Sequence, residues 1–211
     1  MNHIIQKNET PLMNRTYHIT QEPIILASQS PRRKELLEQA GLIFNVLAAN
    51  IDEDAVPLAP PRDYVKNLSR IKAEQIAKGK KNHWVIGADT IVVVEGKILG
   101  KPETREDSIQ MLTELNNKPH SVFTGFTICS HIRGEVITNA IETRVTFKKL
   151  SEREIQWYAS TDEPYDKAGG YGIQGIGAFL VRKISGSYSN VVGLPVCEVM
   201  EALTTLGIIQ F

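Results

Sequence analysis

The apolar and polar residues along the chain alternate in a way that predicts short strands and helices in turn. Residues 24–27 form an apolar run rich in β-branched side chains, which is typical of a buried strand. Residues 28–30 follow with turn chemistry, and Pro31 suits the first position of a helix because its missing N–H costs nothing there. We expect the side chain of Ser30 to cap this helix and Gly41 to end it.

Two longer elements follow, and each carries polar residues within an apolar pattern. Residues 61–80 have the spacing of an amphipathic helix, and Lys72 falls in the middle of its apolar face. Residues 84–94 form the strongest predicted strand, interrupted by Asp89 and Thr90. The apolar face of the helix is predicted from Val65, Leu68, Gln75 and Ile76.

The rest of the chain continues the alternation of elements. The predicted strands are one over 44–47, antiparallel strands between 120 and 150, and one over 178–184, and a hairpin turn at Glu95-Gly96 returns through 97–99. Capping boxes at Thr104 and Ser151 are predicted to open two helices. A turn over 186–190 and a closing helix over 195–206 complete the chain. Without an internal repeat or linker, we expect one domain over residues 22–211, preceded by a disordered extension over residues 1–21.

Composition narrows the classes of function. The 24 Lys and Arg balance the 24 Asp and Glu, which argues against broad electrostatic binding of nucleic acid or anionic membrane. No apolar run approaches the ~18 residues of a membrane-spanning helix, and the N-terminus lacks the apolar core of a signal peptide. Cys129 and Cys197 lie far apart, which suits a reducing cytosol, so we expect a cytoplasmic protein. The five histidines show no metal-binding spacing.

Two arginines lie where a helix disfavours positive charge. Arg32 and Arg33 fall in the first turn of the helix that starts at Pro31, and each weakens it by about 0.3–1 kcal/mol. An anion at the helix N-terminus explains the pair, because arginine forks match phosphate oxygens. The alternative is that both are solvated surface charges.

Lys72 and Asp89 have a functional and a structural interpretation. Lys72 either extends to water at the edge of its helix face or points into a cleft at an anion, and we favour the cleft. A bare buried carboxylate is costly unless it is paired or holds a metal, so we expect Asp89 at a strand bend facing a cleft. Gly87 beside it permits a bulge or a close backbone approach. Asp89 is the best candidate for a catalytic base or metal ligand; otherwise it is a structural residue that caps a turn.

Two further segments carry candidate chemistry. Residues 52–54 are three consecutive carboxylates, either an exposed acidic loop or ligands for Mg²⁺, which prefers one or two carboxylates with phosphate oxygens and water. Residues 162–177 are rich in glycine, which lets backbone approach a ligand closely. Gln174 in this segment can read a base edge by paired donor and acceptor contacts, unless the segment is only a turn region.

Taken together, these motifs resemble the Maf family of nucleoside triphosphate pyrophosphatases over residues 24–206. The resemblance implies an α/β fold: a single elongated Maf-like (ITPase-like) domain, with a twisted mixed β-sheet flanked by helices and a central nucleotide-binding cleft. The matching blocks are Leu26-Ala27-Ser28-x-Ser30-Pro31-Arg32-Arg33, Gly87-Ala88-Asp89-Thr90, Gly100-Lys101-Pro102, Asp166-Lys167-Ala168-Gly169 through Gln174-Gly175, and Gly186-Ser187-Tyr188 with Gly193-Leu194-Pro195.

The resemblance also implies an activity and residue roles. It implies hydrolysis of a nucleoside triphosphate to the monophosphate and pyrophosphate with a divalent metal, Mg²⁺ or Mn²⁺, and a possible homodimer. The segment from Asp166 to Gly175 resembles the branch that acts on dTTP and UTP. The resemblance implies that Asp89 is the proton acceptor and that Glu53 binds the metal together with Asp89. It implies that Arg33, Lys72 and Lys101 neutralise the triphosphate and the pyrophosphate, and that Ser28 binds a phosphate oxygen. It implies that Arg32, Thr90 and Gln174 determine the choice of base.

Two alternatives stay open beside this interpretation. One is a pyrophosphatase of another base specificity, acting on 7-methyl-GTP or a modified purine. The other is a nucleotide-binding regulator of cell division or septum formation. The combination of an acid with several cations argues against a catalytically inactive binder.

Overall fold

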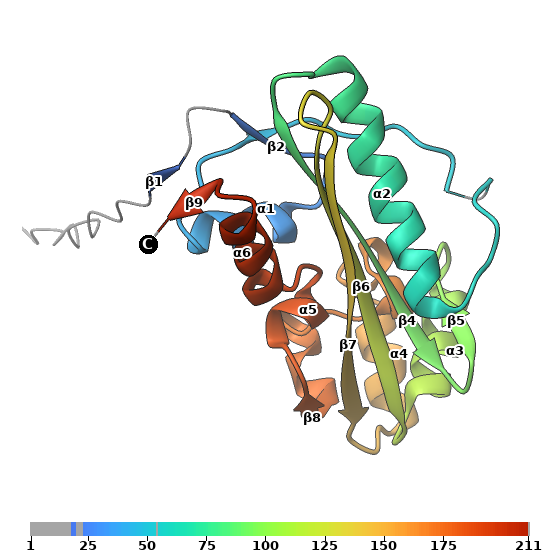
Figure 1. Ribbon diagram of the computed structural model, residues 1–211. Coiled ribbons are helices and arrows are strands. Elements are labelled where there is room, and N and C mark those ends of the chain that lie inside the picture. Colours follow the sequence, from blue (N-terminus) through green and yellow to red (C-terminus); the bar gives the residue numbers. More distant parts are fainter. Residues whose placement is uncertain (1–17, 20–22, 54, 211) are drawn as a thin grey trace, which may run out of the picture.

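The structure is a computed structural model that describes residues 18–19, 23–53 and 55–210 (Figure 1). Its described strands are β1 (His18–Ile19), β2 (Ile24–Leu26), β3 (Asn45–Val46), β4 (Trp84–Val94), β5 (Lys97–Leu99), β6 (Pro119–Ser130), β7 (Glu135–Phe147), β8 (Val181–Ser185) and β9 (Ile209–Gln210). The described helices are α1 (Pro31–Gln39), α2 (Pro61–Gly79), α3 (Arg105–Leu115), α4 (Glu152–Ala159), α5 (Tyr188–Val192) and α6 (Val196–Thr205), with short 3₁₀ turns η1 (Pro164–Asp166), η2 (Ala168–Gly170) and η3 (Ile176–Leu180).

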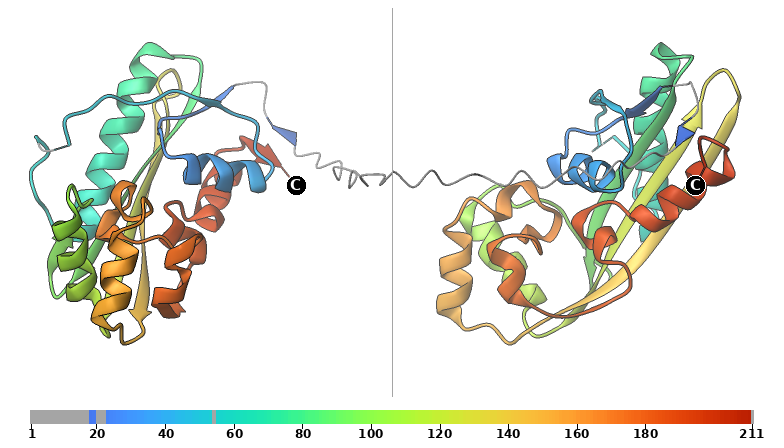
Figure 2. Two further views of the ribbon diagram at one scale, coloured as in Figure 1. Left: turned by 180° about the vertical axis from the view of Figure 1, so that it is seen from behind. Right: turned by 90° about the vertical axis from the view of Figure 1, so that its left-hand side faces the viewer.

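A mixed sheet forms the centre of the molecule. Its strand order is β3-β2-β4-β6-β7-β8, and β5 pairs separately with β4. β2 runs parallel to β3 and β4, whereas β4, β6, β7 and β8 are antiparallel neighbours. The long strands β4, β6 and β7 run the length of the molecule and twist (Figures 1 and 2). The prediction of an α/β fold with a twisted mixed sheet flanked by helices is confirmed.

The two faces of the sheet carry different helices because side chains alternate along each strand. Trp84 and Ile86 on β4 face the core that contains Leu37 of α1 and Leu203 of α6. Val85 points to the opposite face, where α2 packs. Among the described α-helices, α2 lies along that face, while the others lie on the side of α1 and α6 (Figure 2).

Helix α2 approaches the sheet closely at two glycines. A Cβ on Gly87 would lie 2.4 Å from the backbone oxygen of Ser69, and one on Gly125 would lie 2.3 Å from that of Val65. Both contacts are far shorter than real Cβ atoms allow, so these positions accept only glycine without movement of α2. The close backbone approach predicted at Gly87 is confirmed.

The edge of β4 that faces β2 is interrupted. β2 pairs with β4 only over residues 84–86, and β5 pairs with it only over residues 92–94. In the described part of the chain no strand covers this edge between 87 and 91, whereas β6 pairs continuously along the other edge. The interruption leaves the middle of β4 open on this side.

Several local predictions are confirmed. Gly41 has φ +82° directly after the end of α1, and Glu95 and Gly96 have positive φ in the β4–β5 hairpin. Both capping boxes, at Thr104 and Ser151, form with reciprocal hydrogen bonds.

Other local predictions are wrong. Ser30 makes no side-chain capping bond, because the Ser28 hydroxyl takes over this turn by accepting from the Ser30 N–H. Gln75 is exposed rather than part of the buried face of α2, and it donates to the Asn50 carbonyl. Asp89 lies in a continuous register with β6 and not at a bend.

The segment boundaries near the C-terminal half also differ from expectation. The strand expected over 178–184 begins only at Val181, because η3 occupies the preceding residues. The turn expected over 186–190 contains the start of α5, which Ser187 caps. Within the expected N-terminal extension, residues 18–19 pair with β9 instead of being disordered; residues 1–17 and 20–22 lie outside the described part.

Replacing Gly87 by alanine tests the close approach of α2. We expect Gly87→Ala to lower the free energy of unfolding by about 1–3 kcal/mol or more, because the contacted atoms belong to the α2 backbone and cannot turn aside. Gly79→Ala is the matched control, since no atom lies within 4 Å of its added Cβ. Urea unfolding of both variants gives the comparison, and an equal effect would show that α2 yields easily.

Candidate active site

A cavity of about 1090 Å³ lies at the interrupted edge of β4. It is bounded by the turn between β2 and α1, by the middle of β4, and by the loop after β5. The glycine-rich segment and the α5–α6 connection close the remaining sides. Its lining includes all nine residues predicted for the site: Ser28, Arg32, Arg33, Glu53, Lys72, Asp89, Thr90, Lys101 and Gln174.

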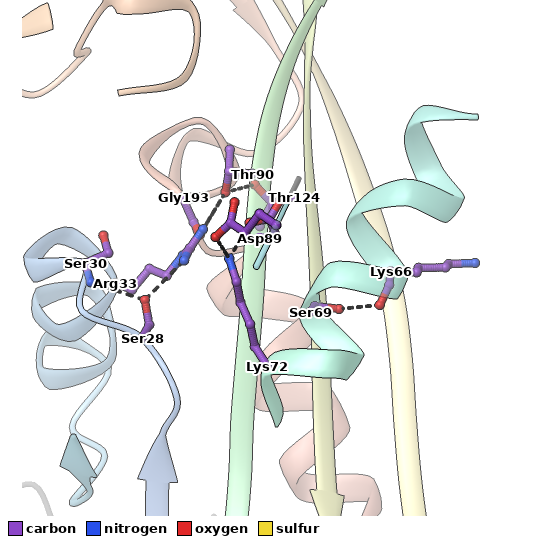
Figure 3. A network of polar contacts seen from close by, with 11 residues as sticks. Ser28, Ser30, Arg33, Lys66, Ser69, Lys72, Asp89, Thr90, Thr124 and Gly193 are labelled. Carbon is purple, nitrogen blue, oxygen red and sulfur yellow. Dashed lines mark hydrogen bonds and ion pairs between the residues drawn. The ribbon is translucent and has the colours of Figure 1, made fainter. Parts of the chain in front are cut away.

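Arg33 ties three separate segments together in this cavity (Figure 3). Its Nε donates to the Gly193 carbonyl at 2.9 Å, and its two terminal nitrogens donate to Ser28 Oγ at 3.1 Å and Thr90 Oγ1 at 3.0 Å. Burial lowers the pKa of Arg33, against the raising effect of Asp89. A guanidinium with little water around it is a strong site for an anion, since its charge is weakly screened.

Lys72 joins the two carboxylates predicted as metal ligands. Its Nζ lies 2.7 Å from Asp89 Oδ1 and 2.7 Å from Glu53 Oε1. The side chains of Lys72 and Asp89 are 12% and 9% exposed, whereas that of Glu53 is 54% exposed. Lys72 therefore points into the cavity, as predicted, and neutralises a carboxylate that would otherwise be buried without a partner.

The two carboxylates have opposite electrostatic settings. Burial raises the pKa of Asp89, and the charges of Lys72 and Arg33 only partly offset this. For Glu53, desolvation also favours protonation, but the hydrogen bond from Lys72 and the charges of Lys72, Lys101 and Arg33 outweigh it and lower the pKa. A buried carboxylate with a raised pKa accepts a proton more readily than a surface one, which suits a general base.

Asp89 and Thr90 reach the cavity from opposite faces of β4. Asp89 points to the α2 side, toward Lys72, and Thr90 points to the α1 side, where its hydroxyl lies 3.0 Å from Thr124 Oγ1 and accepts from Arg33 (Figure 3). Consecutive strand residues always diverge in this way. Both can face one ligand only because the strand edge between them is open.

The rim of the cavity is formed by the glycine-rich segment. The Arg32 guanidinium donates to both the carboxylate and the backbone carbonyl of Asp166. The Glu163 carboxylate accepts from Ile176 N at 2.7 Å and Gly177 N at 2.8 Å, which fixes the backbone just after Gln174. Gln174 itself is exposed at this rim.

Sequence reasoning missed three residues that organise the site. Glu163 and Asp166 were not singled out as partners, although both lie in the glycine-rich segment that was, and the Gly193 carbonyl was not considered as an acceptor for Arg33. Carboxylates flanking a glycine-rich segment are the signal that could have identified the first two. The carbonyl leaves no mark in the sequence.

Comparison with known proteins now adds to this geometry. Residues 23–206 match the family model described as Maf, Maf-like protein. The chain belongs to the Maf family. It is 52% identical over 187 residues to the dTTP/UTP pyrophosphatase of Geotalea uraniireducens (strain Rf4), covering 89% of this chain and 96% of that protein.

Other similar proteins carry the same description. The dTTP/UTP pyrophosphatase of Halalkalibacterium halodurans is 47% identical over 186 residues, which cover 88% of this chain and 97% of that protein.

Among solved structures, the Ham1 protein of Staphylococcus aureus is 15% identical with a TM-score of 0.40, over 59% of this chain and 71% of that one. None of the helices in the described part of this Maf protein combines the length and apolar character of a membrane span.

The carboxylates of this Maf protein fit a divalent cation that is shared with a ligand. Within the described residues, which leave out Asp54, no group of three or more His, Cys, Asp or Glu side chains could hold a metal by itself. Glu53 and Asp89 nevertheless converge on one point, the Nζ of Lys72. Two carboxylates with the remaining positions taken by phosphate oxygens and water are what Mg²⁺ prefers.

A buried histidine supports one wall of the cavity. His120 Nε2 and the hydroxyl of Tyr171, which lines the cavity, share a hydrogen bond at 2.8 Å. Both rings pack edge-to-face with Phe147. Burial lowers the pKa of His120 to about 4, so the folded protein keeps this imidazole neutral.

This neutral imidazole predicts a loss of stability in acid. Between pH 6.5 and about 4 the unfolded chain binds a proton at His120 that the folded protein does not. The free energy of unfolding should therefore fall as pH is lowered through this range, by up to about 1.4 kcal/mol per pH unit. In His120→Gln, which cannot titrate, urea unfolding should show a shallower slope. Parallel slopes would contradict the prediction.

Proposed function

We propose that this protein hydrolyses dTTP and UTP to the nucleoside monophosphate and pyrophosphate. The observation that carries the proposal is Asp89, a buried carboxylate with a raised pKa, placed beside Lys72 and Arg33 in a cavity large enough for a nucleotide. Membership of the Maf family and the similarity to proteins described as dTTP/UTP pyrophosphatases support the reaction and the substrates.

The cations of the cavity bind the triphosphate in this mechanism. Arg33 is held by Ser28 and Thr90 with its fork toward the cavity, and Lys72 reaches the same space from α2. Lys101 is exposed in the cavity wall and has no ion pair in the described part of the chain, so its charge is available to the leaving pyrophosphate. Preorganised charges of this kind stabilise the developing negative charge at little reorganisation cost.

Asp89 acts on the attacking water. Its raised pKa favours its taking a proton from the water that attacks the α-phosphorus, while the neighbouring Lys72 ammonium favours the ionised form of the carboxylate. Glu53 and Asp89 would hold the divalent cation, Mg²⁺ or Mn²⁺. When bound, that cation supplies charge neutralisation at the phosphate oxygens.

The base is recognised at the rim in this proposal. Gln174 offers a donor and an acceptor on backbone fixed by Glu163, and Arg32 is positioned by Asp166. Thr90 contributes through Arg33, whose terminal nitrogen it binds. Removal of non-canonical or modified nucleotides is the physiological role that fits such a pyrophosphatase. A cytoplasmic location agrees with the two free cysteines. A homodimer is the assembly that the resemblance to the Maf family implies.

Pyrophosphate release from a panel of nucleotides tests the proposal. We expect fast release from dTTP and UTP with Mg²⁺ or Mn²⁺, and loss of release with a chelator. The panel also holds CTP, dCTP, GTP, 7-methyl-GTP and ITP. Release only from a purine would keep the reaction and overturn the base assignment of Gln174. Binding without any release would favour the regulatory alternative.

Replacing the proposed base removes turnover without removing the fold. We expect Asp89→Asn to lower kcat by about 10²–10⁴-fold, because the amide cannot accept the proton. Asp63→Asn, at an exposed position in the first turn of α2, is the matched control and should keep wild-type kcat. Thermal unfolding checks that both variants are folded. Retained activity in Asp89→Asn would exclude this residue as the proton acceptor.

A further inference from the structure

Lys72 lies at the one point that both predicted metal ligands share. Its Nζ is 2.7 Å from an oxygen of Glu53 and 2.7 Å from an oxygen of Asp89 (Figure 3 shows the Asp89 contact). The lysine comes from the middle of α2, and its side chain is only 12% exposed. Glu53 comes from the loop before α2 and is half exposed. The ammonium thus links a solvent-facing carboxylate to a buried one.

A divalent cation and this ammonium exclude each other. A cation held by Glu53 and Asp89 through these oxygens would compete with Lys72 for them. The two positive centres would also repel strongly in a partly buried site. The carboxylates can therefore serve either Lys72 or a metal through the same oxygens, but not both.

We propose that Lys72 occupies the position of the divalent cation in the free protein and gives it up when triphosphate binds. A phosphate oxygen offers the ammonium another anionic partner in the same cavity. Once Lys72 turns to it, Glu53 and Asp89 are free to bind the metal. The inference rests on the proposed function, because it takes the ligand to be a triphosphate.

The exchange makes metal and nucleotide binding mutually dependent. Metal affinity is low while Lys72 pairs with the carboxylates and rises when nucleotide draws it away. Linkage requires the metal to raise the affinity for nucleotide by the same factor. Asp89 also stays neutralised throughout: by Lys72 before binding and by the metal after it. The buried carboxylate is therefore never left without a positive partner.

Binding of Mn²⁺ to the protein without nucleotide tests the exchange directly, with electron paramagnetic resonance or calorimetry as the readout. Lys72→Met should bind Mn²⁺ more tightly than the wild type, by about 5- to 150-fold. Lys72→Gln should show the same direction, and its amide can still donate to Asp89 if the methionine variant does not fold. Lys72→Arg keeps a bridging cation and should bind Mn²⁺ weakly, like the wild type.

Lys101→Met is the matched control for loss of charge. Lys101 acts on Glu53 electrostatically but has no hydrogen bond to it in the described structure, so its loss should raise Mn²⁺ affinity much less than the loss of Lys72. Equal gains in both variants would show a general charge effect and overturn the proposal. Wild-type protein that binds Mn²⁺ as tightly as Lys72→Met would also overturn it.

The two proposals fail in different ways. Pyrophosphatase activity is measured with nucleotide present, whereas Mn²⁺ binding is measured in its absence. Absence of hydrolysis with the expected gain in Lys72→Met would reject the function and keep the exchange between lysine and metal. Normal hydrolysis without that gain would reject the exchange and keep the function.

Discussion

The ion pair between Asp89 and Lys72 is the interaction on which the arrangement of this protein depends. A carboxylate in the middle of a buried strand needs a positive partner, and Lys72 supplies it from the helix that packs on the same face of the sheet. Helix α2 reaches it because Gly87 and Gly125 let the helix backbone lie directly on the sheet. The fold therefore determines the geometry of the site, because the two glycines set the distance between α2 and β4 that the Lys72 side chain has to span.

The second requirement is the open edge of β4. A continuous neighbour on this side would cover the backbone between residues 87 and 91 and leave no room for a ligand. β2 ends early because the chain turns at Ser28 into α1, and β5 ends at Leu99, where the chain leaves β4 through Gly100, Lys101 and Pro102. The gap between them brings the helix N-terminus with its arginines beside the carboxylate. Two short strands therefore define the cavity as much as the residues that line it.

Local chemistry made much of this predictable from the sequence. Pro31, the two capping boxes and the Glu95-Gly96 turn act within a few residues, so their effects can be read without the fold. The charged residue within the face of α2 and the carboxylate within β4 were recognised as anomalies because each violates its own periodicity. Their mutual contact was not predicted, since it depends on how α2 lies across the sheet.

The same reasoning explains the errors in the sequence analysis. A bend was expected at Asp89 because an unpaired buried carboxylate is costly and a bend would bring it to a cleft. The ion pair with Lys72 compensates the charge within a regular strand. Ser30 was expected to cap α1, but the hydroxyl of Ser28 organises the turn and also accepts from Arg33. The strand expected before Val181 is replaced by a 3₁₀ turn whose N–H groups bind Glu163. Lys72 and Glu163 are distant along the chain from the residues they bind, whereas Ser28 is a nearby hydroxyl that was not weighed against Ser30.

The alternation of Asp89 and Thr90 across β4 separates two hydrogen-bond networks. Asp89 belongs to the network of α2, whereas Thr90 belongs to that of α1 and the α5–α6 connection, and the hydrogen bonds described for the two side chains have no partner in common. A substitution at Thr90 therefore leaves the direct contact between Asp89 and Lys72 in place, and it reaches Asp89 only through the charge of Arg33. Under the roles proposed here, base choice and water activation would depend on different neighbours of one strand.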